Sequence, residues 1–149
     1  MSDGTRNSVE EGVTFPHLVK WVEMVTRAQA ERAIRSLPIS GSQLFALVLL
    51  SERGEATSAD LARMMQTTPQ ALTTLLRPLR DGGYIERRTD DEHARRMPLK
   101  LTAKGQAILE QARAHSPAIE DTLLADFSAE ERATLKEYLA RIARRFDGS

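Results

Sequence analysis

Four side chains in residues 70–77 have the types and the spacing to form hydrogen bonds with a polar partner. Gln70, Thr73, Thr74 and Arg77 recur at helical spacing, so they share one face of a helix. The face is free of acidic residues, and its N-terminal end carries short side chains. Amide, hydroxyl and guanidinium groups of this kind contact base edges and phosphates. The helix alone leaves open whether this face binds nucleic acid or is an ordinary solvated surface.

The helix that carries this face has signals at both ends. Thr68 is a favourable N-cap, and Pro69 suits the first helical position, where a missing amide costs nothing. Gly82 and Gly83 end the helix, because glycine readily adopts the left-handed conformation found there. Pro78 removes a hydrogen bond inside the helix, so we expect a kink or an early loosening. The opposite, buried face is predicted from apolar residues at i, i+3, i+4 and i+7, which are Leu72, Leu75, Leu76 and Leu79.

A β-hairpin is predicted after this helix. Residues 84–88 and 97–101 alternate as strands do, and the connection at residues 89–96 is too polar to be core. Pro98 limits the second strand to an edge, or to a position whose amide is unpaired. Residues 77–104 contain eight basic and five acidic residues in a chain whose net charge is zero. Such a cluster is a modest electrostatic footprint for DNA, although a bare charge cluster is more often a solvated hairpin.

Two more helices are predicted before this segment. Ser40 and Gln43 form a capping box for a helix with a nearly continuous apolar run. Thr57 opens a short helix that continues to about Met65. The short helix, a polar turn and the next helix have the order of a helix-turn-helix, to which the hairpin adds a wing. We therefore predict a mainly α (α+β) fold containing a winged helix-turn-helix with a two-stranded wing.

These motifs resemble the MarR (multiple antibiotic resistance regulator) family of winged-helix transcription regulators. The matching residues are Gln43, Ala59-Asp60-Leu61-Ala62, the leucines of the second helix, Gly83-Tyr84-Ile85-Glu86-Arg87 and Leu101-Thr102-Ala103-Lys104-Gly105. The wing of this family usually carries Asp-x-Arg, which aligns with His93-Ala94-Arg95. The resemblance therefore gives Arg95 the role of the arginine in the minor groove. His93 replaces the aspartate, whose salt bridge would then fall to Asp90 or Asp91.

The helical face and the resemblance together predict a set of residues that contact double-stranded DNA. They are Thr68, Pro69, Gln70, Thr73, Thr74, Arg77, Arg88, His93, Arg95 and Arg96. The resemblance also implies a pseudo-palindromic operator, because a twofold dimer presents two recognition helices to half-sites about one DNA turn apart.

The two ends of the chain are predicted to form such a dimer. Residues 39–101 make the DNA-binding part of a single module at 13–149, and residues 13–37 and 102–147 make its helical dimerisation part, after a mobile tail at 1–12. Thr102 and Ser128 cap two helices of this part, with a kink expected at Pro117. The two C-terminal helices are too long and too apolar along one stripe for a monomer of 149 residues, and together with the first helix they resemble the dimer-forming part of the family. The stripes are Ile108, Ala112, Ile119 and Leu123 in the first of the two, Leu135, Tyr138, Leu139, Ile142 and Phe146 in the last, and Leu18, Trp21, Val22, Val25 and Ala28 in the first helix of the chain.

Several classes of protein are excluded by composition. The chain has no cysteine, which rules out disulfides, thiolate metal sites and a thiol redox switch. No segment suggests a signal peptide or a membrane span, so we expect a cytoplasmic protein without a membrane partner. The motifs of phosphate loops and of catalytic nucleophiles are missing, so we expect neither an enzyme nor a cofactor. His93 beside Asp90 and Asp91 is a conceivable metal site, but a solvated histidine is favoured, and no metal is predicted.

The regulatory signal is predicted to be a bound molecule, since thiol chemistry is absent. Trp21, Met24 and Phe45 would give an apolar wall and Thr73 or Arg87 a polar contact, which suits a small aromatic or lipophilic acid. The same apolar residues also suit a core or an interface. The sequence thus favours a dimeric transcription repressor released from DNA by such a ligand. The alternative is a winged-helix module that binds other proteins and not DNA.

Overall fold

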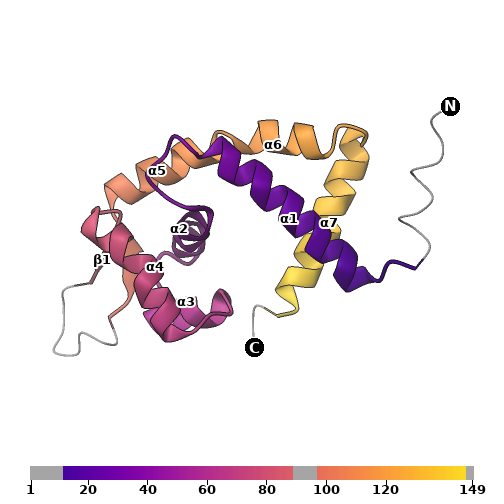
Figure 1. Ribbon diagram of the computed structural model, residues 1–149. Helices are drawn as coiled ribbons and strands as arrows, with labels where there is room; N and C mark the ends of the chain where they lie inside the picture. The colour runs from indigo at the N-terminus through magenta and orange to yellow at the C-terminus, as the bar shows by residue number, and fades with distance from the viewer. Residues whose placement is uncertain (1–11, 89–96, 147–149) are drawn as a thin grey trace.

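The computed structural model describes residues 12–88 and 97–146, in which seven helices and two strands occur. They are α1 (Phe15–Ala33), α2 (Gly41–Arg53), α3 (Ser58–Met64), α4 (Pro69–Asp81), β1 (Ile85–Arg87), β2 (Leu99–Leu101), α5 (Ala103–Arg113), α6 (Ser116–Leu123) and α7 (Ala129–Arg144). Helices α1, α6 and α7 lie at one end of the molecule, and α2, α3, α4 and the strands lie at the other (Figure 1). Helix α5 connects the two ends. The predicted winged helix-turn-helix fold is confirmed, while the predicted tail lies outside the described residues except for Gly12.

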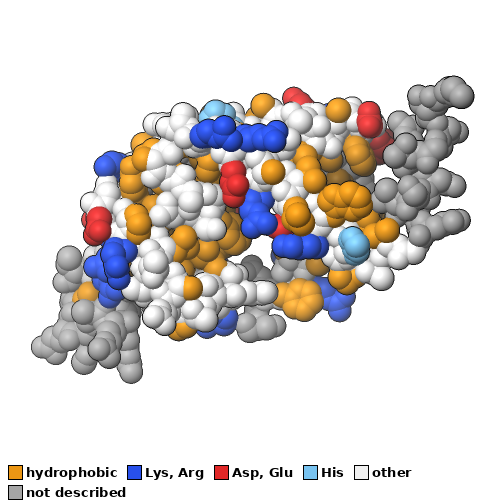
Figure 2. All heavy atoms as spheres, in the orientation of Figure 1, with side chains coloured by type: hydrophobic (Ala, Val, Ile, Leu, Met, Phe, Trp, Pro, Cys, Tyr) orange, Lys and Arg blue, Asp and Glu red, His pale blue; other side chains and the backbone are white. Residues whose placement is uncertain are grey.

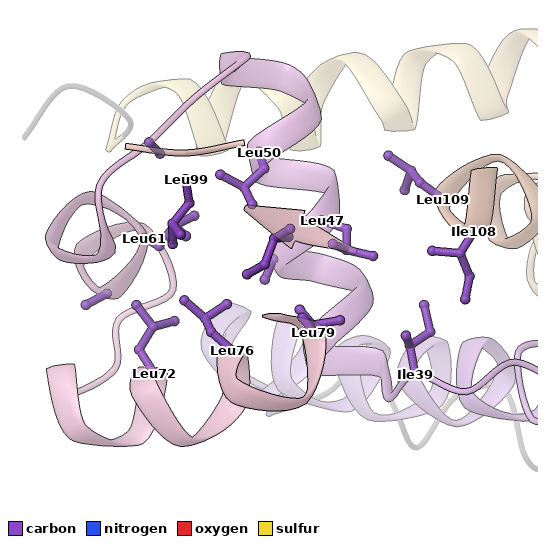
Figure 3. Close-up of a cluster of buried hydrophobic side chains, with 14 residues drawn as sticks. Ile39, Leu47, Leu50, Leu61, Leu72, Leu76, Leu79, Leu99, Ile108 and Leu109 are labelled. Atoms are coloured by element: carbon purple, nitrogen blue, oxygen red, sulfur yellow. The ribbon is translucent and has the colours of Figure 1, made fainter. Parts of the chain in front are cut away.

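A single core of leucine-rich packing holds α2, α3, α4 and the sheet together. Leu47 and Leu50 of α2 belong to one cluster with Leu72, Leu76 and Leu79 of α4, and all five are at most 3% exposed (Figure 3). Burying one such leucine side chain stabilises the fold by about 1.5–3 kcal/mol. Other members of the core come from α3, β2 and α5, namely Leu61, Leu99, Ile108 and Leu109. The apolar face predicted for α4 is therefore the face that packs on α2.

The wing is an antiparallel pair in which Ile85 lies opposite Leu101 and Arg87 lies opposite Leu99. Leu99 also pairs on its other side, where its amide donates to the carbonyl of Ala56 at 2.8 Å and its carbonyl accepts from the amide of Ala56 at 3.1 Å. The connection between α2 and α3 thus adds one residue of strand to the wing. Pro98, which has no amide to donate, lies just before β2 and accepts from Arg88 through its carbonyl. The sequence did not predict the pairing with Ala56.

Pro78 and Pro117 affect their helices differently. Helix α4 continues through Pro78 to Asp81, so the early loosening expected there does not occur. Pro78 and Thr74 are both exposed, and water can satisfy the carbonyl of Thr74 that loses its helical donor. At Pro117, where a kink is expected, the helix is interrupted: α5 ends at Arg113 and α6 begins at Ser116, while Ala114 and His115 between them keep right-handed helical dihedral angles. A proline in the first turn suits a helix start better than a helix interior.

The two ends of the molecule differ in burial. No residue of α1, α6 or α7 is buried. Large apolar side chains instead line α1 and the end of α7, and Figure 2 shows them over α1. They are Phe15, Leu18, Val19, Trp21, Val22, Met24 and Val25, and Tyr138, Leu139, Ile142 and Phe146. Contiguous exposed apolar patches of this kind mark interaction surfaces. Among the described helices, none has both the length and the apolar character to cross a bilayer.

Candidate nucleic-acid interface

Capping boxes begin both α2 and α3, the two helices before α4, and the box of α2 also contacts α4. In α3, the hydroxyl of Thr57 accepts from the amide of Asp60 at 3.1 Å, and the carboxylate of Asp60 accepts from the amide of Thr57 at 3.1 Å. Hydrogen bonding to the carboxylate by the side chain and the amide of Thr57 holds the pKa of Asp60 below its usual range, with Arg63 adding a smaller effect. In α2, Gln43 completes the box with Ser40 and also donates from its side chain to the carbonyl of Leu75 at 3.4 Å. The capping of α2 is therefore linked directly to the backbone of α4.

The turn between α3 and α4 is tight and ends in a second cap. Gln66 adopts a left-handed conformation with φ of 51°, which is uncommon for a residue with a Cβ. The amide of Gln66 donates to the carbonyl of Arg63, and the amide of Thr67 donates to that of Ala62. This is the pairing of a Schellman motif, with glutamine where glycine is usual. Thr68 then caps α4 by accepting from the amide of Ala71 at 3.1 Å.

The outer face of α4 presents the predicted side chains to solvent. Gln70, Thr73, Thr74 and Arg77 are all exposed. The hydroxyl of Thr73 donates to the carbonyl of Pro69 at 2.9 Å, and the hydroxyl of Thr74 donates to the carbonyl of Gln70 at 3.2 Å. Because each hydroxyl proton is used within the helix, the hydroxyl oxygens remain available as acceptors toward solvent. The guanidinium of Arg77 and the side-chain amide of Gln70 add donors to the same face. The face can accept from the amino groups of bases and donate to base carbonyls and phosphates.

Helix α4 ends at the two glycines as predicted, with Gly82 still in a right-handed conformation and Gly83 in the left-handed one. Gly83 has φ of 75°. Its amide donates to the carbonyl of Arg80, and the amide of Tyr84 donates to the carbonyl of Leu79, which completes a Schellman motif. The hydroxyl of Thr102 donates to the carbonyl of Gly83 at 2.5 Å. The C-terminal end of α4 is thus tied to the start of α5.

Gly105 explains the spacing of the Leu-Thr-x-x-Gly motif. A Cβ at this position would lie 2.0 Å from the carbonyl oxygen of Tyr84, so only glycine allows the two segments to approach. The same carbonyl accepts from the amide of Thr102 at 3.1 Å, and the hydroxyl of Thr102 accepts from the amide of Gly105 at 3.0 Å. Threonine caps α5, and the glycine three residues later lets α5 pack against the base of the wing.

The wing carries part of the predicted set. Arg88 is exposed and forms an ion pair with Glu55 at 3.5 Å. The predicted contacts His93, Arg95 and Arg96 lie outside the described residues, as does the conceivable metal site at His93. Within residues 12–88 and 97–146, no three His, Asp or Glu side chains gather closely enough to hold a metal ion. The remaining predicted contacts all lie on the surface, and these are Thr68, Pro69, Gln70, Thr73, Thr74, Arg77 and Arg88.

A cavity of about 870 Å³ lies between α2, α3 and the C-terminal end of α7. Its apolar lining includes Phe45, Leu49, Met64, Ile142 and Phe146, and charged side chains of α2 and α3 surround it. Phe45 belongs to the predicted ligand set, whereas the other four members of that set line other surfaces. Trp21 and Met24 lie on the exposed stripe of α1, Thr73 on the outer face of α4, and Arg87 on β1. Sequence reasoning missed Met64 and Ile142, because the side of the helix that faces a cavity depends on packing between distant segments.

Comparison with known proteins agrees with this architecture. Residues 37–96 match the model of the MarR family. The HTH-type transcriptional repressor Rv2887 of Mycobacterium tuberculosis is 32% identical over 126 residues, which cover 85% of this chain and 91% of that protein. A crystal structure of Rv2887 in complex with DNA has a TM-score of 0.72 and 31% identity, covering 87% of this chain and 98% of that one. A structure of Rv2887 with salicylic acid has a TM-score of 0.75 and 30% identity, covering 89% and 98%. The similarities in sequence and in architecture show that the chain belongs to the MarR family.

Proposed function

We propose that this chain is a dimeric transcription repressor that binds double-stranded DNA and releases it when a small aromatic or lipophilic acid binds. The observation that carries the proposal is the outer face of α4, which is exposed, contains no acidic side chain and is rich in hydrogen-bonding groups. The relative Rv2887 is named a transcriptional repressor, and its structures contain DNA or salicylic acid. The role is binding and not catalysis, and we place the protein in the cytoplasm, where such DNA lies.

The proposal divides the chain between two tasks. Residues 39–101 form the DNA-binding part, which contains most of the buried core. Residues 13–37 and 102–147 form the dimerisation part, whose exposed apolar stripes a second copy would cover. A twofold arrangement of the two α4 helices matches a pseudo-palindromic operator. The proposed DNA contacts are Thr68, Pro69, Gln70, Thr73, Thr74, Arg77, Arg88, His93, Arg95 and Arg96.

Selection of bound sequences from random duplex DNA tests the proposal directly. A sequence-specific regulator should enrich a pseudo-palindrome, and its affinity should fall steeply with salt because phosphate contacts release counterions. A winged-helix module that binds proteins would enrich no sequence and show no measurable affinity for duplex DNA. That outcome would favour the protein-interaction alternative over a regulator.

Substitutions should separate the roles of the wing and of α4. Arg77→Ala and Thr73→Ala should lower affinity for the operator by about 1–3 kcal/mol while changing affinity for random DNA much less, because both face the bases. Arg95→Ala should weaken binding to both kinds of DNA, since the resemblance assigns it to the minor groove and its phosphates. Titrations of all three variants on both duplexes measure this. Equal losses for all three on both duplexes would contradict these roles.

The proposed effector should act on the free protein and on its DNA complex in opposite ways. Aromatic carboxylates such as salicylate should raise the melting temperature of the free protein and weaken its binding to the operator. A ligand shifts the equilibrium toward the conformation that it binds more tightly, which here would be the one that does not bind DNA. The fluorescence of Trp21, a member of the predicted ligand set, should change when the acid binds. Phe45→Ala should weaken the effect if the acid occupies the cavity beside α2. Unchanged melting and DNA affinity across a panel of such acids would exclude this class of effector.

A further inference from the structure

Lys104 lies at the second position of α5, where its own helix disfavours a cation. The first turn of a helix carries partial positive charge and the last turn partial negative charge. The ammonium of Lys104 instead donates to the carbonyl of Gly82 at 2.6 Å and lies 4.7 Å from the centre of the Tyr84 ring. Gly82 is the C-cap of α4, where a cation is favourable. The negative end of the α4 dipole, and not the dipole of α5, therefore explains why a cationic side chain lies at this position.

Lys104 is one part of a joint between the two helices. Three successive carbonyls after α4 each accept from the first residues of the α5 segment. Gly82 accepts from Lys104, Gly83 from the hydroxyl of Thr102, and Tyr84 from the amide of Thr102. Helix α5 leads from this joint toward α6 and α7 at the other end of the molecule (Figure 1). The direction of α4 is thus set relative to the helices that carry the exposed apolar stripes.

We propose that Lys104 is a positioning residue for DNA recognition, which holds the C-terminal end of α4 at a fixed angle to α5. The inference rests on the proposed function, because an angle between these helices matters only if two α4 helices must meet two half-sites. Base contacts require a defined geometry, whereas phosphate contacts tolerate more displacement. Loss of Lys104 therefore reduces the preference for the operator and leaves the general attraction to DNA nearly intact.

Replacing Lys104 with methionine removes the donor and the charge but keeps an unbranched side chain. Lys104→Met should lower affinity for the operator about tenfold, the size of one charge-assisted hydrogen bond. Affinity for random duplex DNA and the dependence of binding on salt should stay nearly the same. Lys104→Arg, which retains a cationic donor, should restore most of the lost preference. A lysine that merely contacts phosphate would give equal losses on both duplexes and reduce the salt slope by about one, which would overturn the inference.

Lys100→Met is the matched comparison. Lys100 is an exposed lysine of β2 that pairs with Glu86 at 3.5 Å, so its loss removes a nearby charge without releasing a helix end. The ratio of operator to random affinity should fall with Lys104→Met and not with Lys100→Met. A fall of equal size in both variants would show that charge alone matters and would overturn the positioning role.

Hydrogen exchange in the free protein tests the joint without DNA. The amides of Gly83 and Tyr84, which bond to Arg80 and Leu79, should exchange faster in Lys104→Met than in the wild type. Unchanged exchange would overturn the inference even if the wild type binds its operator. A wild type that binds no duplex DNA would overturn the proposed function and the positioning role together, so the two failures are distinguishable.

Discussion

A lysine in place of Leu139 on α7 should convert the dimer into a monomer and lower operator affinity at least about a hundredfold. Leu139 is 50% exposed in the single chain, and Ile142 and Phe146 beside it are 41% and 70% exposed. In a dimer that covers this stripe, the ammonium would be buried without a partner. Two joined recognition helices gain affinity because binding at one half-site holds the second helix near the other. A monomer loses that gain.

Sedimentation at micromolar concentration and operator titration together measure this effect. Glu137→Lys is the matched control, because it introduces the same side chain about 200° away around the helix. Glu137 is exposed, and this variant should remain a dimer with operator affinity close to that of the wild type. Deleting the chain from Ala129 should reproduce the loss caused by Leu139→Lys. A wild type that is monomeric at micromolar concentration would remove the basis of the prediction, and a dimeric Leu139→Lys would exclude this stripe from the interface.

Gly105→Ala should lower the free energy of unfolding by about 3 kcal/mol or more, the upper range for overpacking. The added Cβ would lie 2.0 Å from the backbone oxygen of Tyr84, where no flexible side chain can move aside. Relief requires the start of α5 to separate from the base of the wing. That movement would strain the hydrogen bonds between Thr102 and the carbonyls of Gly83 and Tyr84. Gly105→Ala should therefore both lower the stability of the protein and loosen the C-terminal end of α4.

Urea unfolding of Gly105→Ala and of Gly41→Ala checks this account. Gly41 opens α2, and a Cβ there would meet only the side chain of Glu31, at an ordinary distance of 3.5 Å. Alanine favours helix over glycine by up to about 1 kcal/mol, so Gly41→Ala should be neutral or slightly stabilising. If Gly105→Ala unfolds at the same urea concentration as the wild type, the close approach of Tyr84 is not a constraint.

The elements that local sequence determines were predicted well. Ser40, Thr57, Thr68, Thr102 and Ser128 all cap helices through their own side chains. A cap depends on a residue and on the amide two or three positions later, so sequence spacing is enough to find it. The buried face of α4 could be predicted equally well, because helical periodicity determines which residues share one side of a helix.

The contacts between segments distant in the chain could not be predicted in this way. Pairing of Ala56 with Leu99 and the reach of Lys104 to Gly82 join residues that are far apart in the chain. The motif around Gly105 was visible, but the approach of Tyr84 that requires glycine was not. The predicted ligand residues also lie apart in the single chain, since Phe45 lines the cavity while Trp21 lies on the exposed stripe of α1.

The unequal burial of the two ends makes protein concentration a determinant of folding. Helices α1, α6 and α7 contain no buried residue in the single chain, whereas α2 to α5 have a core of their own. A second copy that covers the terminal helices would stabilise them, because association favours the folded chain that it binds. The melting temperature should therefore rise with total protein, and amides of α1 should lose protection on dilution before those of α2. Single chains at low concentration should therefore be cleaved by proteases faster than dimers, beginning in the exposed terminal helices.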